Sequence, residues 1–255
     1  MTSVVRYDVD GRVATITLDS PENRNALSRA LVGELIDHLA AAGQDPGVRV
    51  VILTHTGTVF CSGADLTEAG SGSMSAATTS MTGVMTTITE LDKPVIAKVS
   101  GHVRAGGLGI VGACDIAVAS ETASFAFTEA RIGLAPAIIS MTTLDQMRPR
   151  AAARYCLTGE TFGGTAAAEI GLITEATSSG SIDDVVTRLA EQICETSPQG
   201  AAETKRLLTA ARRRRMAADA PGLAALSARL FASEEAQEGI HAFLERRHPS
   251  WRKLS

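Results

Sequence analysis

Two short glycine-containing segments and one glutamate carry the residue types with which this chain could do chemistry. The first segment, FCSGADL at residues 60–66, places Gly63 where a turn would let the backbone approach a ligand closely. In the second, Gly106 and Gly107 precede an apolar run, where a helix would begin with unpaired N–H groups. Two such N–H groups aimed at one oxygen form an oxyanion hole, and losing one donor costs about 3–4 kcal/mol in the transition state. The pattern therefore indicates that backbone amides could stabilise a negatively charged oxygen.

Glu129 is the candidate acid or base. It follows the alternating apolar segment SFAF at residues 124–127 and precedes Arg131. A carboxyl group in an apolar setting has a raised pKa, which suits proton transfer near neutral pH. A surface glutamate beside Arg131 fits the same spacing, so the residues alone leave both interpretations open.

Gly107, Gly109 and Gly112 also spell G-x-G-x-x-G, the fingerprint of dinucleotide-binding proteins. That fingerprint requires a strand running directly into the first glycine and a long helix after it. Here several residues separate the predicted strand at 95–99 from Gly107. The next apolar strand, at 115–119, leaves room for only about two helical turns. The surroundings therefore favour the oxyanion interpretation over a dinucleotide site.

The elements that would position these residues alternate between strands and helices. Residues 4–18 alternate around an Asp-Gly pair, which predicts a β-hairpin, and leucine recurs every four residues from 27 to 39, which predicts an amphipathic helix. We expect helix almost everywhere from Asp183 onward, and no linker defines a second independent domain. The other predicted elements are strands at 48–54, 95–99, 115–119, 124–127 and 172–175, helices at 84–91 and 151–157, and a mobile loop with weak helical character at 70–82. This order is typical of an α/β fold with short strands.

Composition excludes several classes of protein. The 255 residues carry a net charge of −4 and only 4% aromatic residues, which argues against nucleic-acid binding. No apolar run approaches the roughly 20 residues of a membrane span, and the N-terminus lacks a signal-peptide core. The four cysteines are scattered and the five histidines have no metal-ligand spacing, so we predict a cytoplasmic protein without a metal site.

Several motifs in order resemble one enzyme family across nearly the whole chain. They are FCSGADL, then KPVIAKVSGHVRAGGLGIVGACDIAVAS, then FAFTEARIGLAP. The early PENRNAL at residues 21–27 resembles P-x-x-x-N-A-L, and AFLERRHP at 242–249 resembles the ending A-F-x-E-K/R-R-x-P. Together these segments resemble the enoyl-CoA hydratase/isomerase (crotonase) superfamily.

The resemblance implies a fold and an assembly. The fold would be a crotonase-like spiral of β-β-α units over residues 1–195. A C-terminal helical layer at 196–255, in the same structural unit, would assemble homotrimers or hexamers. The partner would be an acyl-CoA substrate, with coenzyme A as part of that substrate and no separate cofactor.

The resemblance also assigns roles by position. Ala64 and Gly106 fall where the family's two oxyanion N–H groups lie, and Glu129 matches the second of the two catalytic glutamates of the hydratases. Substrate and coenzyme A contacts would come from Arg24, Asn25, Ala26, Ser62, Gly63, Ala64, Asp65, Leu66, Gly106, Gly107 and Gly109.

One position departs from the hydratase pattern. The first hydratase glutamate would stand at position 109, which is glycine here. Hydration could proceed with water held by Glu129 and other polar groups, and it is our first interpretation. The alternatives are isomerisation of a double bond with one glutamate, or space at Gly109 for a bulky acyl group whose carboxylate could face Arg104 or Arg131. A catalytically inactive acyl-CoA-binding protein also stays open.

Two further groups of residues invite interpretation. The run Arg212–Arg215 reads as the basic end of a helix, with contact to coenzyme A phosphates as an alternative. Met74, Met81 and Met85 could pack over a pocket for an apolar ligand, because methionine adapts to variable shapes.

Overall fold

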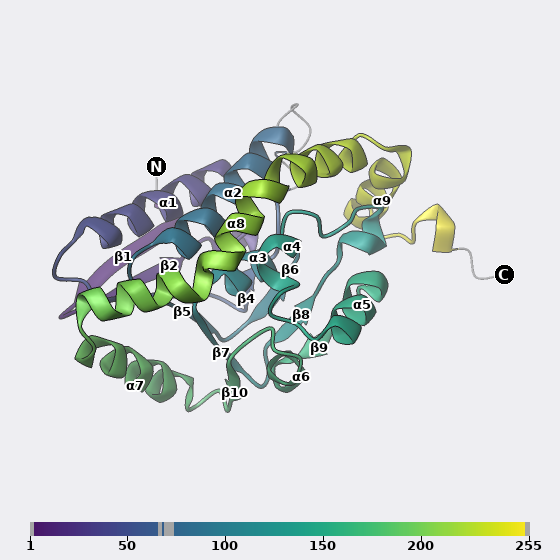
Figure 1. Cartoon of the computed structure of the whole chain (residues 1–255). Helices are drawn as coiled ribbons and strands as arrows, with labels where there is room; N and C mark the ends of the chain where they lie inside the picture. The colour runs from purple at the N-terminus through teal and green to yellow at the C-terminus, as the bar shows by residue number, and fades with distance from the viewer. Residues whose placement is uncertain (1–2, 66–67, 69–73, 253–255) are drawn as a thin grey trace.

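Two sheets receive strands in alternation as the chain advances (Figure 1). The computed structural model describes residues 3–65, 68 and 74–252. The larger sheet consists, in spatial order, of β1 (Val5–Asp10), β2 (Val13–Leu18), β3 (Val50–His55), β5 (Val95–Val99), β7 (Ile116–Ser120) and β10 (Glu175–Thr177). The smaller consists of β4 (Val59–Cys61), β6 (His102–Arg104), β8 (Ser124–Ala126) and β9 (Phe162–Gly163). The predicted hairpin is confirmed, because β1 and β2 pair antiparallel around Gly11.

Each turn of the spiral adds one strand to each sheet. Strands β3, β5 and β7 are parallel neighbours in the larger sheet, while β4, β6 and β8 are parallel neighbours in the smaller. The helices are α1 (Arg29–Gln44), α2 (Met74–Glu90), α3 (Gly106–Ala113), α4 (Ser140–Thr143), α5 (Pro149–Thr158), α6 (Gly164–Glu169), α7 (Ile182–Glu195), α8 (Pro198–Phe231) and α9 (Glu234–Leu244). Helices α2 and α3 follow β4 and β6, so the predicted spiral of β-β-α units is confirmed.

Two predicted element boundaries were wrong. The segment 70–82 was expected to be a mobile loop with only weak helical character, but α2 begins at Met74. Its small and β-branched residues have modest helix propensity, and packing against α1 and α8 stabilises it instead. The strand expected at 172–175 begins only at Glu175, because the apolar character of Leu172 and Ile173 reflects burial in the core rather than pairing with β7.

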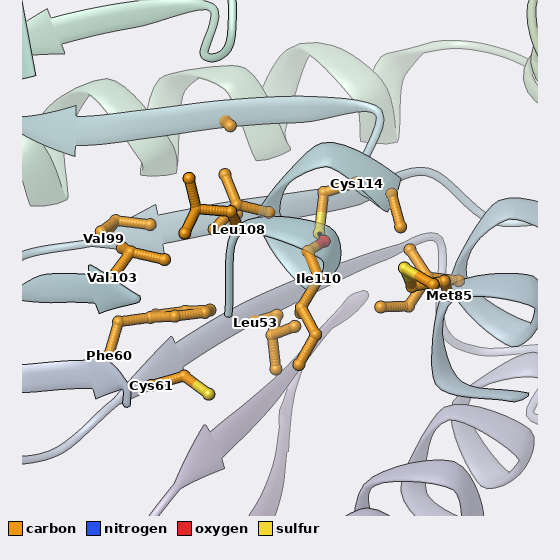
Figure 2. Packing of buried hydrophobic residues seen from close by; sticks show 14 of the residues in the cluster. Leu53, Phe60, Cys61, Met85, Val99, Val103, Leu108, Ile110 and Cys114 are labelled. Carbon is orange, nitrogen blue, oxygen red and sulfur yellow. Dashed lines mark hydrogen bonds between the residues drawn. The ribbon is translucent and has the colours of Figure 1, made fainter. Parts of the chain in front are cut away.

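The main core lies between the sheets and the helices that follow them. Figure 2 shows Leu108 of α3 pointing toward Val99 and Val103, with Phe60 and Cys61 nearby. All of these side chains are 0% exposed. Helix α3 is therefore held at its sides by a dry, closely packed surface, which fixes where its first residue lies.

A second core covers the other face of the larger sheet. Ile182 and Val186 of α7 pack on Val50, Ile96 and Val118. The predicted helical last third is confirmed by α7, α8 and α9, and Figure 1 shows α8 running across the molecule past α2. Helix α7 ends at Glu195.

A buried ion pair fastens α8 to the spiral. Lys205 of α8 is 4% exposed and lies 2.7 Å from an oxygen of Asp115. Its ammonium group also donates to the carbonyl oxygens of Ile88 and Lys93 at 2.9 and 3.0 Å. Oδ2 of Asp115 accepts a further bond from the Val95 N–H at 2.8 Å, so each member of the pair has hydrogen bonds besides the ion pair itself.

Candidate active site

The first candidate turn follows β4, and hydrogen bonds from the bend at residues 24–27 hold it in place. Gly63 has φ +100°, a conformation that L side chains rarely adopt. The Leu27 N–H donates to the Gly63 carbonyl at 2.8 Å, and the Ser62 N–H donates to the Arg24 carbonyl at 3.2 Å. A parallel bridge joins Leu27 to Ala64. The bend at residues 24–27 therefore sets the path of the turn on which Ala64 lies.

The second candidate turn joins β6 to α3. Ala105 has φ 45° and ψ −118°, an unusual conformation for a residue with a side chain, costing about 1–3 kcal/mol. A Cβ built on Gly63 would lie 2.9 Å from the Cβ of Ala105 and 3.6 Å from the Gly106 nitrogen. The two turns are therefore in contact, and the glycine at position 63 permits that approach.

The N–H groups of Ala64 and Gly106 are available on these two turns. Within the described residues, neither donates a hydrogen bond inside the chain. The Gly106 N–H belongs to the unpaired first turn of α3, where the helix dipole also favours negative charge. An arrangement of this kind can bind one oxygen that carries developing negative charge.

Glu129 begins the short 3-10 helix η3 (Glu129–Ile132) just after β8. Its side chain is buried, and among the described residues its Oε2 has no hydrogen-bond partner. Loss of hydration raises the pKa of this carboxyl group to about 7. A carboxyl group with that pKa exchanges protons readily near neutral pH.

Helix α9 packs against η3, the short helix that begins with Glu129. Gly133, with φ +75°, ends η3, and a Cβ there would lie 2.6 Å from the backbone carbon of Glu235. A Cβ on Gly239 would lie 2.5 Å from the backbone of Ile132. Backbone therefore packs directly on backbone at both positions, which explains why each is glycine.

One cavity of about 370 Å³ brings these groups together. Six of the residues that the resemblance assigned to the site lie on its wall: Arg24, Ser62, Ala64, Asp65, Gly106 and Glu129. Most of the remaining lining is apolar and comes from the segment between η3 and α4 and from α2, α8 and α9. The residues that carry the two amides and the desolvated carboxyl group therefore line one largely apolar cavity.

Comparison with known proteins agrees with this architecture. The family model described as enoyl-CoA hydratase/isomerase matches residues 8–254. The chain belongs to the enoyl-CoA hydratase/isomerase family. A crystal structure of an enoyl-CoA hydratase from Mycobacterium avium is 52% identical, with a TM-score of 0.92 over 98% of this chain and 100% of that one.

Curated family members carry out more than one reaction. The 2,3-dehydroadipyl-CoA hydratase of Escherichia coli is 30% identical over 94% of this chain and 95% of its own length. The peroxisomal Delta(3,5)-Delta(2,4)-dienoyl-CoA isomerase of Arabidopsis thaliana is 30% identical over 98% and 96%. Membership of the enoyl-CoA hydratase/isomerase family therefore does not determine which reaction is catalysed, and the residues of the site must be used to choose between them.

Several residues assigned by position contribute to the site without lining the cavity. Asn25 and Ala26 are buried in the bend that holds the first turn. A Cβ on Gly107 would lie 2.8 Å from that of Cys61, so this glycine allows α3 to pack closely on β4. Leu66 lies outside the described residues. The structure thus brings together part of the predicted set and gives the glycines of α3 a packing role.

The packing around Gly109 argues against the alternative in which this glycine leaves space for a bulky acyl group. A Cβ there would lie 2.8 Å from Cγ2 of Ile139 and 2.8 Å from Sδ of Met85. Neither Gly109 nor Met85 is among the residues that line the cavity. The hydratase pattern has its first glutamate at this position. Here the space beside Gly109 is filled by the apolar side chains of Met85 from α2 and of Ile139 from the segment before α4.

The arginines considered from the sequence are largely held by other parts of the chain. Arg104 lines the cavity, but its guanidinium donates to the Ser124 carbonyl at 2.7 Å and to its hydroxyl at 2.8 Å. Arg131 is exposed and donates to the Thr158 carbonyl. Burial lowers the pKa of Arg104, and its contacts with Ser124 hold it against the smaller sheet.

The arginine run lies in the middle of α8, so its interpretation as a helix end was wrong. Arg212 and Arg215 both pair with Asp145, at 3.0 and 2.8 Å, and Arg213 lies 3.9 Å from Glu90. These contacts attach α8 to neighbouring elements. Among the methionines, Met81 lines the cavity, whereas the side chain of Met74 lies outside the described part of the chain.

Sequence reasoning missed the residues that close the cavity from the helical side. They are Thr78 and Ser80 of α2, Ser227 and Phe231 of α8, and Phe243 of α9. Phe243 is 59% exposed although it borders the cavity, which places it at an opening. Phe243 belongs to the AFLERRHP motif and could have been chosen as a candidate, whereas nothing in the local sequence distinguishes Thr78 or Ser227.

Proposed function

We propose that the protein converts enoyl-CoA thioesters through an enolate, and that addition of water to a 2-enoyl-CoA is its reaction. The observation that carries the proposal is the cavity shared by the Ala64 and Gly106 amides and the buried Glu129 carboxyl group. The two amides would bind the thioester oxygen as it becomes negative, and Glu129 would carry the proton.

Hydration can be completed with Glu129 as the one carboxylate. The oxygen of a water molecule bonds to the β-carbon while ionised Glu129 accepts one of its protons. The electron pair of the carbon–carbon double bond moves toward the thioester oxygen, which the two amides stabilise. Glu129 then returns the proton to the α-carbon and is ionised again. Two relatives support this choice, because the Mycobacterium avium structure and the Escherichia coli protein are both named as hydratases.

Isomerisation of a double bond is the second candidate, and the packing at Gly109 favours it. Ile139 and Met85 occupy the space where a second carboxylate would orient water. Glu129 would then remove a proton from the α-carbon of a 3-enoyl-CoA and return it to the γ-carbon, with the same oxyanion between the steps. The Arabidopsis thaliana relative is named as an isomerase.

The test is an assay of purified protein with matched 2-enoyl-CoA and 3-enoyl-CoA substrates. Loss of the 2-enoyl absorbance with formation of the 3-hydroxyacyl-CoA supports hydration, whereas migration of the double bond without uptake of water supports isomerisation. Binding without turnover of any enoyl-CoA would identify an inactive acyl-CoA-binding protein and overturn the proposal.

A further inference from the structure

Two buried hydroxyl groups from distant parts of the chain meet on the cavity wall. Thr78 of α2 and Ser227 of α8 are 7% and 8% exposed, and both line the cavity. Their oxygens lie 3.4 Å apart, at the long limit of a hydrogen bond. The pair therefore joins the two helices only weakly while presenting polar atoms to the interior of the cavity.

The hydrogen-bonding capacity of this pair is mostly unused. Each hydroxyl has one donor and two acceptor positions, and within the described residues the contact between them is the one side-chain hydrogen bond of either. Valine and alanine would fill nearly the same volumes without burying a hydroxyl group. A polar partner from a ligand would account for hydroxyl groups at both positions.

The surroundings of the pair indicate an uncharged partner. The residues that α2, α8 and α9 contribute to the cavity are Thr78, Ser80, Met81, Ser227, Phe231 and Phe243. None of these described lining residues is charged, while the charged lining residues belong to other elements: Arg24, Arg29, Asp65, Glu68, Arg104 and Glu129. An acidic group would have no cation on this side of the cavity to balance its charge.

We propose that Thr78 and Ser227 bind an uncharged oxygen, a hydroxyl or a carbonyl group, carried by the acyl chain away from the thioester. This inference rests on the proposed function, which places the thioester and the reacting carbons at Ala64, Gly106 and Glu129. The side formed by α2 and α8 then receives the remainder of the acyl group. The substrate class is accordingly an oxygenated acyl-CoA rather than a plain alkyl one.

Calorimetric titration with saturated acyl-CoA ligands tests the proposal without any turnover. Hexanoyl-CoA and octanoyl-CoA would each be compared with the counterpart that carries a hydroxyl group at the chain end. In at least one pair the hydroxylated ligand should bind about tenfold more tightly, as expected for one to two added hydrogen bonds. Equal affinities within both pairs would overturn the proposal.

Variants assign the preference to the two hydroxyl groups. Thr78→Val together with Ser227→Ala should reduce the preference to within about twofold, while the plain chain binds at least as tightly as before. Thr78→Ser keeps a hydroxyl group and should keep the preference. Thr82→Val, which makes the same change one helical turn further along α2 and outside this cavity, is the matched control.

The outcomes separate this proposal from the proposed function. A preference that survives in the double variant would overturn the role of Thr78 and Ser227. If the double variant loses its cooperative thermal transition, the single variants carry the test, and each should lose part of the preference. Failure to bind any acyl-CoA would instead overturn the proposed function.

Discussion

The side-chain amide of Asn25 donates a 2.7 Å hydrogen bond to the carbonyl oxygen of Val59, the first residue of β4. The same amide donates to the Thr56 carbonyl, and its oxygen accepts the Ser20 N–H at 2.8 Å. Asn25 is 0% exposed and has φ 50°, a left-handed conformation that asparagine tolerates better than most residues. The bend that clamps the Ala64 turn is therefore held to β4 by one buried side chain.

Asn25 is predicted to position the first amide donor. Replacement by alanine leaves a buried N–H group and two carbonyl groups without this partner, so the free energy of unfolding should fall by about 2–4 kcal/mol. The turnover number should fall at least tenfold, with a smaller change in the affinity for free coenzyme A, because the misplaced donor matters mainly in the transition state.

Asn23→Ala is the control for this prediction. Asn23 donates to Asp65 at an exposed position, so its loss should change stability by less than about 1 kcal/mol. If Asn25→Ala lowers turnover and coenzyme A affinity by the same factor, Asn25 supports the fold of this region in general and has no specific positioning role.

Glu129→Gln should lower turnover of the enoyl-CoA substrate by at least about 100-fold, the low end for a positioned acid–base group. Glu68→Gln, which changes a carboxylate beside Arg29 on the same cavity, is the matched control and should retain most activity. Steady-state kinetics at saturating substrate would measure both. Near-normal turnover of the Glu129 variant would remove this residue from the reaction.

The activity of the wild-type enzyme should depend on the ionisation of Glu129. Both candidate reactions begin with the ionised carboxylate, so kcat/KM should rise with pH and level off above a pKa of about 7. The profile belongs to the free enzyme, in which the carboxyl group is desolvated. A profile that falls through pH 7 would show that the reaction begins instead with the protonated acid.

Burial of Glu129 should also make stability depend on pH, with a sign opposite to that of a salt-bridged carboxylate. Its pKa of about 7 in the folded protein lies above the ordinary value of 4.5, so the folded state binds more protons between these pH values. The free energy of unfolding therefore falls as pH rises through this window. Relative to the wild type, Glu129→Gln should gain up to about 3 kcal/mol above pH 7, and the gain should vanish below pH 4.5. Denaturant titrations at several pH values would measure the difference.

The sequence was sufficient to predict features that depend on local chemistry. The hairpin around Gly11 and the turn at Gly63 follow from residue types and alternation within a few positions, whereas the burial of Glu129, which the sequence left open, is shown by the structure. The contact between Thr78 and Ser227 spans 149 positions and depends on how α8 lies against α2. No local pattern encodes that geometry, and the same is true of the apolar side chains that fill the space at Gly109.

The interpretation of Gly109 shows why a glycine alone is ambiguous. An absent side chain can mean open space for a ligand or a close approach of neighbouring groups, and the two cases read identically in a sequence. Here Ile139 and Met85 approach it, so the meaning of the glycine was decided by residues far away along the chain. Gly106 is a similar case, since a Cβ built there would lie 2.7 Å from Cδ1 of Leu27.

Gly109→Ala is predicted to destabilise the protein even though alanine is the better helix former. The added methyl group would meet Ile139 and Met85 at 2.8 Å, and such overpacking costs about 1–3 kcal/mol. Gly33→Ala is the matched control, because Gly33 is an exposed position of α1 with nothing within 4 Å of its added Cβ. That change should stabilise the protein by about 0.5–1 kcal/mol. Thermal unfolding of both variants should move in opposite directions, and a stable Gly109→Ala protein would mean that Ile139 can withdraw and reopen this space.

The ion pair between Lys205 and Asp115 is predicted to be expensive to break. Lys205→Met keeps most of the side-chain volume but leaves Asp115 buried without its cation, which should cost about 3–5 kcal/mol in unfolding free energy. The neighbouring Arg206→Met is the control, because Arg206 pairs with Asp92 at the exposed surface, where a pair contributes about 0–1 kcal/mol.

Replacing Asp115 by asparagine in the Lys205→Met background should recover part of the loss, since the unpaired charge is then gone. If the double variant is as unstable as Lys205→Met, the stabilisation comes instead from the hydrogen bonds that Lys205 donates to the carbonyl oxygens of Ile88 and Lys93.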